Sequence, residues 1–132
     1  MSAPARFFAL ALSLLLTLPG CGAALVGAGV AIGVWVHDEN SDDGGAIVLP
    51  YQPDVVLRVA EAVTRERAEE IKVMRGSRRI ECVIDDVNVK VHILEIMGKP
   101  DVTEMKIRAR TLWRTRADLA EDLAVSIQNR IG

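Results

Sequence analysis

The chain has 132 residues, a formal net charge of -2 and two cysteines. This length accommodates one small domain and a tether, since single domains commonly have about 100–150 residues. The near-balanced charge argues against nucleic acid as a partner, because nucleic-acid-binding domains are usually clearly basic. The mean hydropathy is +0.22, but the apolar residues are concentrated in residues 7–36. The remainder has the composition of an ordinary soluble domain.

Residues 1–20 have the pattern of a secretory signal peptide. Arg6 precedes an apolar run over residues 7–18, and Pro19 and Gly20 follow it. A charged start, an apolar stretch of about 7–15 residues and small residues at the cleavage site are what such a peptide requires. The pattern therefore predicts export of the rest of the chain.

The end of this segment, Leu18-Pro19-Gly20-Cys21, resembles the lipobox of bacterial lipoproteins, with Pro19 where Ala, Ser, Thr or Val is usual. The resemblance implies that Cys21 is lipidated and becomes the first residue of the mature chain. Several acyl chains hold a protein stably on a membrane. Gly22 stands where inner-membrane lipoproteins carry Asp, which implies the periplasmic leaflet of the outer membrane. The alternative is an uncleaved signal anchor in the inner membrane, with the domain again outside the cytoplasm.

The segment from Gly22 to Val36 carries no charge. As a helix it would span about 22 Å, less than the roughly 30 Å of a bilayer's hydrocarbon core. Gly29 and Gly33 have the spacing that lets apolar helices approach closely in lipid, and Trp35 suits a membrane boundary. Two interpretations stay open. The segment inserts into the membrane and self-associates through Gly29 and Gly33, or it is a flexible apolar tether.

Residues 37–45 are rich in acidic and turn-forming residues and lack apolar periodicity. They predict a solvated linker, so that residues 21–45 connect the anchor to a domain at 46–132. Asp38, Asn40 and Asp42 match the opening of a calcium-binding EF-hand loop, but the Gly and the Glu that such a loop requires are missing. We therefore expect no metal site here.

The domain itself shows the periodicities of strands and helices. Period-2 alternation and turn residues predict strands at 46–51, 71–74, 80–84, 87–93 and 103–109, with turns at 75–78, 85–86 and 98–101. A break in the alternation at residues 94–96 predicts a bulge. Apolar residues at helical spacing predict helices from Pro53 to about Arg67 and from about Arg116 to Ile131. The order β-α-β-β-β-β-α indicates an α+β, two-layer domain: an antiparallel sheet of about five strands with both helices on one face.

No residue pattern points to catalysis. Cys82 alternates with Ile80 and Ile84, which predicts a core position rather than a nucleophile. The two histidines have no metal-ligand spacing, and no nucleophile or phosphate-loop motif is present. The adjacent Asp85 and Asp86 fit a solvated hairpin turn better than an acid/base pair. We therefore expect no cofactor, no catalytic residues and no enzyme activity.

The outer side of the last predicted strand and its exit is basic. Arg108, Arg110, Trp113 and Arg114 form the predicted partner-binding site, because exposed arginine beside tryptophan is typical of interfaces. The partner would be anionic, either an acidic protein surface or anionic lipid headgroups. The competing interpretation is a solvated strand face on which Trp113 covers the sheet edge. Under the interface interpretation, changing Arg108 and Arg110 to glutamate is expected to abolish binding and leave the domain folded.

The predicted partner-binding residues belong to a larger basic face. It also carries Lys90, His92, Lys106 and, at the exit, Arg116.

The lipobox, the Gly-rich apolar stretch, the acidic residues 38–43 and the order of elements together resemble the DUF3568 family, small bacterial lipoproteins of unknown function. The resemblance implies an envelope protein and supplies no catalytic residues. Similar helix-and-sheet domains in lipoprotein accessories of outer-membrane assembly machines suggest a binding role by analogy. The predicted function is a membrane-anchored periplasmic lipoprotein with a structural or protein-interaction role. The alternatives are a periplasmic small-ligand-binding module and, less favoured, an enzyme with an unrecognised site.

Overall fold

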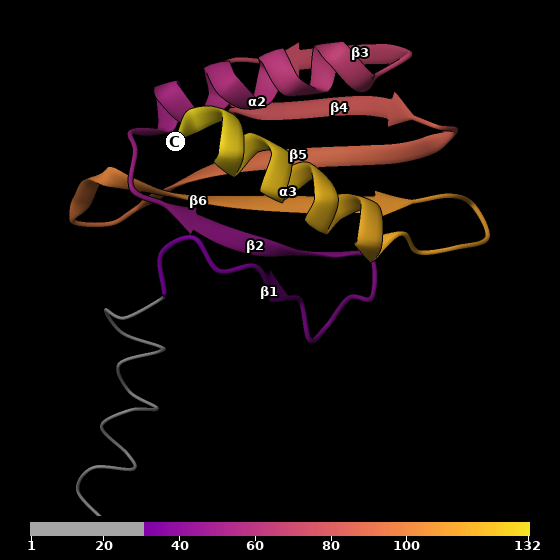
Figure 1. Cartoon of the computed structure of the whole chain (residues 1–132), viewed down its shortest axis with the longest axis horizontal. Coiled ribbons are helices and arrows are strands. Elements are labelled where there is room, and N and C mark those ends of the chain that lie inside the picture. The colour runs from indigo at the N-terminus through magenta and orange to yellow at the C-terminus, as the bar shows by residue number, and fades with distance from the viewer. Residues whose placement is uncertain (1–30) are drawn as a thin grey trace, which may run out of the picture. The chain divides into compact units, whose positions relative to one another are not determined.

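A six-stranded antiparallel sheet is the frame of the structure, a computed structural model that describes residues 31–132. The strands lie in the order β1-β2-β6-β5-β4-β3. In chain order the elements are β1 (Val36–His37), β2 (Gly44–Leu49), α2 (Pro53–Arg67), β3 (Glu70–Met74), β4 (Arg79–Ile84), β5 (Val87–Ile96), β6 (Lys99–Arg110) and α3 (Ala117–Ile131). Both helices cover the same face of the sheet (Figure 1). The predicted α+β class is confirmed.

The core lies between the two helices and one face of the sheet. Along β5, Val87, Val89 and Val91 are each 1% exposed, and the residues between them face the other way. Leu123 and Ile127 of α3 are fully buried against this face. Each such side chain stabilises the fold by about 1.5–3 kcal/mol when it is removed from water. Burial of these side chains therefore holds the helices against the sheet.

The two helices are joined to each other by ion pairs at their exposed sides. Arg130 donates to both carboxylate oxygens of Glu66, at 2.9 and 2.8 Å, and lowers the pKa of Glu66. Arg67 lies 3.0 Å from Asp122. Exposed pairs add little stability each, so we assign them a role in fixing how α2 and α3 are aligned.

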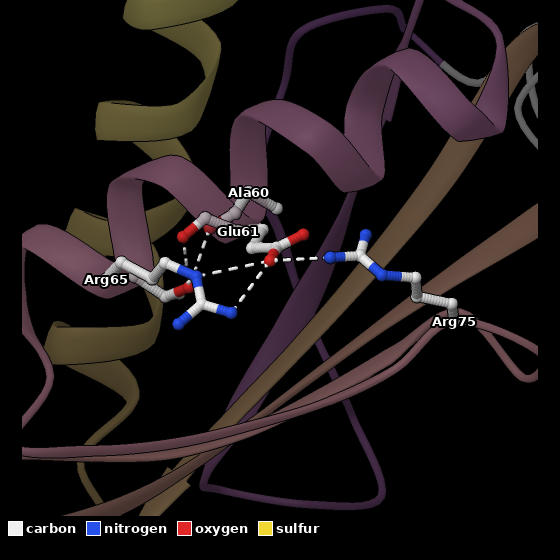
Figure 2. Close-up of polar contacts among 5 residues, drawn as sticks. Ala60, Glu61, Arg65 and Arg75 are labelled. Atoms are coloured by element: carbon white, nitrogen blue, oxygen red, sulfur yellow. Dashed lines mark hydrogen bonds and ion pairs between the residues drawn. The ribbon is translucent and has the colours of Figure 1, made fainter.

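Helix α2 is also tied to the turn between β3 and β4. Glu61 accepts hydrogen bonds from Arg65, one turn along the helix, and from Arg75 in that turn, each at 2.9 Å (Figure 2). The hydrogen bond from Arg65 is the largest influence on Glu61 and lowers the pKa of its carboxyl group, against a smaller opposing effect of burial. A single carboxylate thus connects helix α2 to the hairpin that follows it in the chain.

The expected linker at 37–45 is wrong at both of its ends. Residues 36 and 37 form β1, which pairs with β2, and Gly44 and Gly45 are the first residues of β2. A Cβ on Gly44 would lie 1.9 Å from the carbonyl oxygen of Ile107, and one on Gly45 2.2 Å from that of Val36. These glycines permit close strand approach rather than ending a linker. The sheet accordingly has six strands instead of about five.

The interpretation of residues 22–36 as one continuous segment is also corrected at its end. Gly33 has φ of 79°, donates to the carbonyl oxygen of Val48 at 2.8 Å and accepts from the Gln128 side chain at 3.1 Å. Trp35 packs on the core, with its ring edge-on to His37. Gly33 therefore belongs to the domain, which removes it from a helix face that could self-associate, and Trp35 is engaged with protein.

Several predicted features fall outside the described residues. These are the signal peptide at 1–20, Cys21 and Gly29. Within residues 31–132, no helix is long and apolar enough to cross a membrane.

The other predicted elements differ from the structure at their ends, and three of the four residues of the turn predicted at 98–101 belong to β6. The register between β5 and β6 shifts at Glu95/Ile96, where a bulge is predicted. Asp85 and Asp86 have φ of 50° and 64° in the two-residue turn between β4 and β5, the left-handed values of a type I′ hairpin. Cys82 is 5% exposed in the core, as predicted. Burial raises the pKa of its thiol to about 11, so it is protonated at neutral pH.

Candidate functional site

The face of the sheet away from the helices carries the polar side chains of every long strand. The register places Arg79 of β4, His92 of β5 and Lys106 of β6 directly opposite one another. The next row of the same face holds Glu81, Lys90 and Arg108. We call this surface the open face.

The open face is hollowed where the hairpin of β1 and β2 meets β6. The hollow has a volume of about 700 Å³. Its residues come from β1, the following turn and strands β2, β4, β5 and β6: Val36, His37, Asp38, Glu39, Asn40, Gly45, Ala46, Arg79, Ile80, Glu81, Lys90, Val91, His92, Lys106 and Arg108. The small side chain of Ala46, opposite Lys106 in the register, leaves the space. Sequence reasoning missed the hollow, because Val36 was assigned to the apolar segment and residues 37–40 to a linker.

His92 lies at the centre of the basic part of this hollow. Arg79 and Lys106 flank it on the neighbouring strands, and Lys90 is two residues away on the same face of β5. Partial burial, and then the charges of Arg79 and Lys106, lower the pKa of the imidazole below its ordinary value of 6.5. His92 is therefore a neutral hydrogen-bonding group among cations at physiological pH.

Arg108, predicted as a partner-binding residue, forms ion pairs within the domain. Its Nε lies 3.5 Å from Oδ1 of Asp43, whose side chain is only 7% exposed, and its Nη2 lies 3.9 Å from Asp38. Ser41 also donates to the Asp43 carboxylate. A buried carboxylate needs such partners. Glutamate at 108 would place two carboxylates together, so we now expect this change to destabilise the domain.

The other predicted residues separate from Arg108. Arg110 ends β6, whereas Trp113 and Arg114 belong to the loop of residues 111–116 that leads to α3 and extends past the end of the sheet (Figure 1). Trp113 is 92% exposed and Leu112 is 87% exposed. Trp113 therefore does not cover the sheet edge, which corrects that part of the competing interpretation. Leu112 was missed, because a leucine beside a strand end normally indicates core.

This loop has a defined conformation built by Thr111. The Thr111 backbone N–H donates to the carbonyl oxygen of Arg114 at 2.7 Å, and the Thr111 hydroxyl accepts from the backbone of Arg114 at 3.0 Å and of Trp113 at 3.3 Å. Behind the tip, Arg110 pairs with Thr115, and Arg116 donates to the carbonyl oxygen of Ala109 at 2.8 Å. The apolar pair Leu112 and Trp113 is therefore held out by a closed turn. We call residues 110–114 the Trp loop.

The arginines around the tip differ in whether they form ion pairs. Arg116 pairs with Asp118 at the start of α3, at 3.0 Å. Among the described residues, Arg110 and Arg114 make no ion pair within 4.0 Å. Two cations thus flank an exposed Trp–Leu pair, and arginine and tryptophan are enriched at interfaces.

The remaining candidate residues lie in turns of the domain. Asp85 and Asp86 occupy the hairpin turn between β4 and β5. Asp38 accepts from the backbone of Asn40 at 2.9 Å, which closes the turn after β1. In the described part of the chain, no three His, Cys, Asp or Glu side chains are grouped so as to hold a metal ion.

Comparison of this chain with protein-family models, curated proteins and solved structures gave no match. The resemblance to the DUF3568 family therefore stays a prediction, and the function is argued from the geometry of the domain.

Proposed function

We propose that this protein is a lipid-anchored lipoprotein of the bacterial cell envelope, not an enzyme, whose periplasmic domain binds an acidic protein partner through the Trp loop. The single observation that carries the proposal is the ordered display of Trp113 and Leu112 between Arg110 and Arg114. Burying so large an apolar pair on a partner is favourable, and the two arginines add bidentate donors for carboxylates.

A protein partner suits this tip better than lipid headgroups. The tip is narrow and fixed by the hydrogen bonds of Thr111, which keeps the entropy cost of binding small. A rigid aromatic anchor with a charged rim matches a pocket in another protein. Lipid headgroups would instead be met by a broad basic surface, and Arg108 and Arg116 are already paired with acids.

The location is proposed from the sequence motif at Cys21 and is tested separately. Changing Cys21 to Ser should abolish acylation and the cleavage that depends on it. Mass spectrometry of the amino-terminal peptide should show acyl groups on Cys21 in the natural protein. Unchanged processing in the Ser variant would refute the anchor without bearing on the Trp loop.

The binding role is tested by placing a photo-crosslinking amino acid at position 113 of the full-length protein in living cells. Position 97 is a matched control, because Met97 is 99% exposed in the hairpin between β5 and β6. The proposal expects one discrete crosslinked protein from position 113 and none from position 97. Equal, diffuse crosslinking from both positions would contradict it.

A further inference from the structure

The hollow on the open face is separate from the Trp loop, since none of residues 110–114 lines it. Its walls come from strands and from the turn after β1, so it is built by the sheet itself. A volume of about 700 Å³ is within the range of small-molecule sites. The question is which chemistry its side chains would recognise.

The basic side chains of the hollow are only partly neutralised by the protein. Lys106 lies 3.7 Å from Glu104, and Arg108 is held by Asp43. Within residues 31–132, Arg79 and Lys90 make no ion pair within 4.0 Å, although Glu81 stands opposite Lys90 in the register. Two cations in a hollow therefore keep their hydrogen-bond donors available.

The register brings these donors within reach of one point. Directly opposite residues on adjacent antiparallel strands have Cβ atoms about 4.5–5.5 Å apart, and Arg79 and Lys106 stand on either side of His92. Long side chains on both sides can close over an anion above the imidazole. Arg offers a planar pair of donors and Lys a compact charge, which together suit the oxygens of a phosphate.

The opposite wall has a different character. Val36 is 53% exposed, and Ala46 lies between it and Lys106 in the register. Two of the three acids of the hollow, Asp38 and Glu39, lie in the turn beyond Val36, and the third, Glu81, stands opposite Lys90. A ligand would thus place its charged end over β4, β5 and β6 and a short apolar part over Val36 and Ala46.

We infer that the hollow binds the phosphate group of a small phosphoester, held by Arg79, Lys90 and Lys106 around His92. Two sources supply this chemistry, a free phosphoester in the periplasm and the headgroup of an anionic phospholipid. The binding role is independent of the Trp loop and does not require the anchor at Cys21.

The test uses full-length protein in an uncharged maltoside detergent, which contributes no phosphate. Isotope-labelled protein is titrated with inorganic phosphate, with glycerol 3-phosphate and with micelles containing phosphatidylglycerol, while the NMR signals of the His92 ring and of the backbone at Lys90 and Lys106 are followed. We expect saturable shifts at these residues. Tighter binding of glycerol 3-phosphate assigns a free ligand, and tighter binding of the lipid micelles assigns a headgroup.

Matched variants separate a specific site from general attraction. Lys90→Gln should weaken binding by about tenfold or more, as expected for losing one charge-assisted hydrogen bond, and Lys90→Arg should restore most of it. Arg58→Gln removes the same charge from the exposed side of α2 and should leave binding unchanged. The inference is overturned if no titrant gives a saturable shift, or if Lys90→Gln and Arg58→Gln behave alike.

Discussion

The guanidinium group of Arg108 lies 3.5 Å from the carboxylate of Asp43, a residue 5% exposed in the turn that leads into β2. The backbone of Ala109 also donates to the carbonyl oxygen of Asp43 at 2.8 Å. This pair fastens the β1–β2 hairpin to β6. It also supports the wall of the hollow, because Asp38 in the same hairpin lies 3.9 Å from Arg108.

Arg108→Glu should therefore destabilise the domain. It leaves the Asp43 carboxylate without its cation and adds a second negative charge beside it, which should cost about 1–3 kcal/mol. Urea denaturation followed by circular dichroism measures the loss. Arg110→Glu, on the same face of the same strand, should change stability by less than about 0.5 kcal/mol. Equal effects of the two variants would show that the Arg108–Asp43 pair does not support the fold.

Leu123→Ala should be costly for a different reason. The side chain is fully buried between α3 and the sheet, so truncation removes burial and leaves a cavity, at about 2–5 kcal/mol. Val125→Ala on the same helix is the control, since Val125 is 41% exposed and should lose far less. Similar denaturation midpoints for both variants would mean that α3 does not pack as the structure shows.

A substitution in the β4–β5 hairpin should increase the stability of the protein. Asp86 holds φ of 64°, a left-handed conformation that glycine adopts more easily, so Asp86→Gly should stabilise the protein by about 0.5–1 kcal/mol. Gly98→Ala makes the reverse change, because Gly98 has φ of 79° and open space around its Cα. It should destabilise the protein, and a gain in stability there would contradict the assigned backbone conformation.

His92 predicts a pH dependence of stability. Its pKa is lowered in the folded protein relative to the ordinary value of 6.5, so the unfolded chain binds the proton more readily. Its contribution to stability is therefore complete above about pH 6.5 and is lost as the pH falls through the lowered folded pKa. Urea midpoints measured between pH 5 and 8 should fall less steeply on acidification in His92→Gln. An identical pH profile would refute the assignment.

Local sequence patterns were enough to predict both helices and the strands after residue 70, because each has a clear period and is bounded by turn residues. The β1–β2 hairpin was not predictable in this way. Its acidic and glycine residues have the composition of a linker. The need for the glycines appears only when β2 lies between β1 and β6, where Gly44 leaves room for the carbonyl group of Ile107 and Gly45 for that of Val36.

The candidate site could be predicted only in part, and the reason is related. The sequence places Arg108, Arg110, Trp113 and Arg114 close together, but it does not show that Asp43, far away in the chain, neutralises Arg108. Nor does it show that the bonds of Thr111 hold Trp113 out into solvent. Both facts depend on tertiary contacts. These contacts remove Arg108 from the predicted partner-binding residues and add Leu112 to them.

The measurement that tests the central proposal most directly is hydroxyl-radical footprinting of the natural protein in intact cells and after purification. Trp113 and Met97 are 92% and 99% exposed, so both should be oxidised readily in the purified protein. The proposed interface predicts that Trp113 is protected in cells while Met97 is oxidised as before. Equal oxidation of Trp113 in cells and in the purified protein would contradict the proposal that the Trp loop binds a partner.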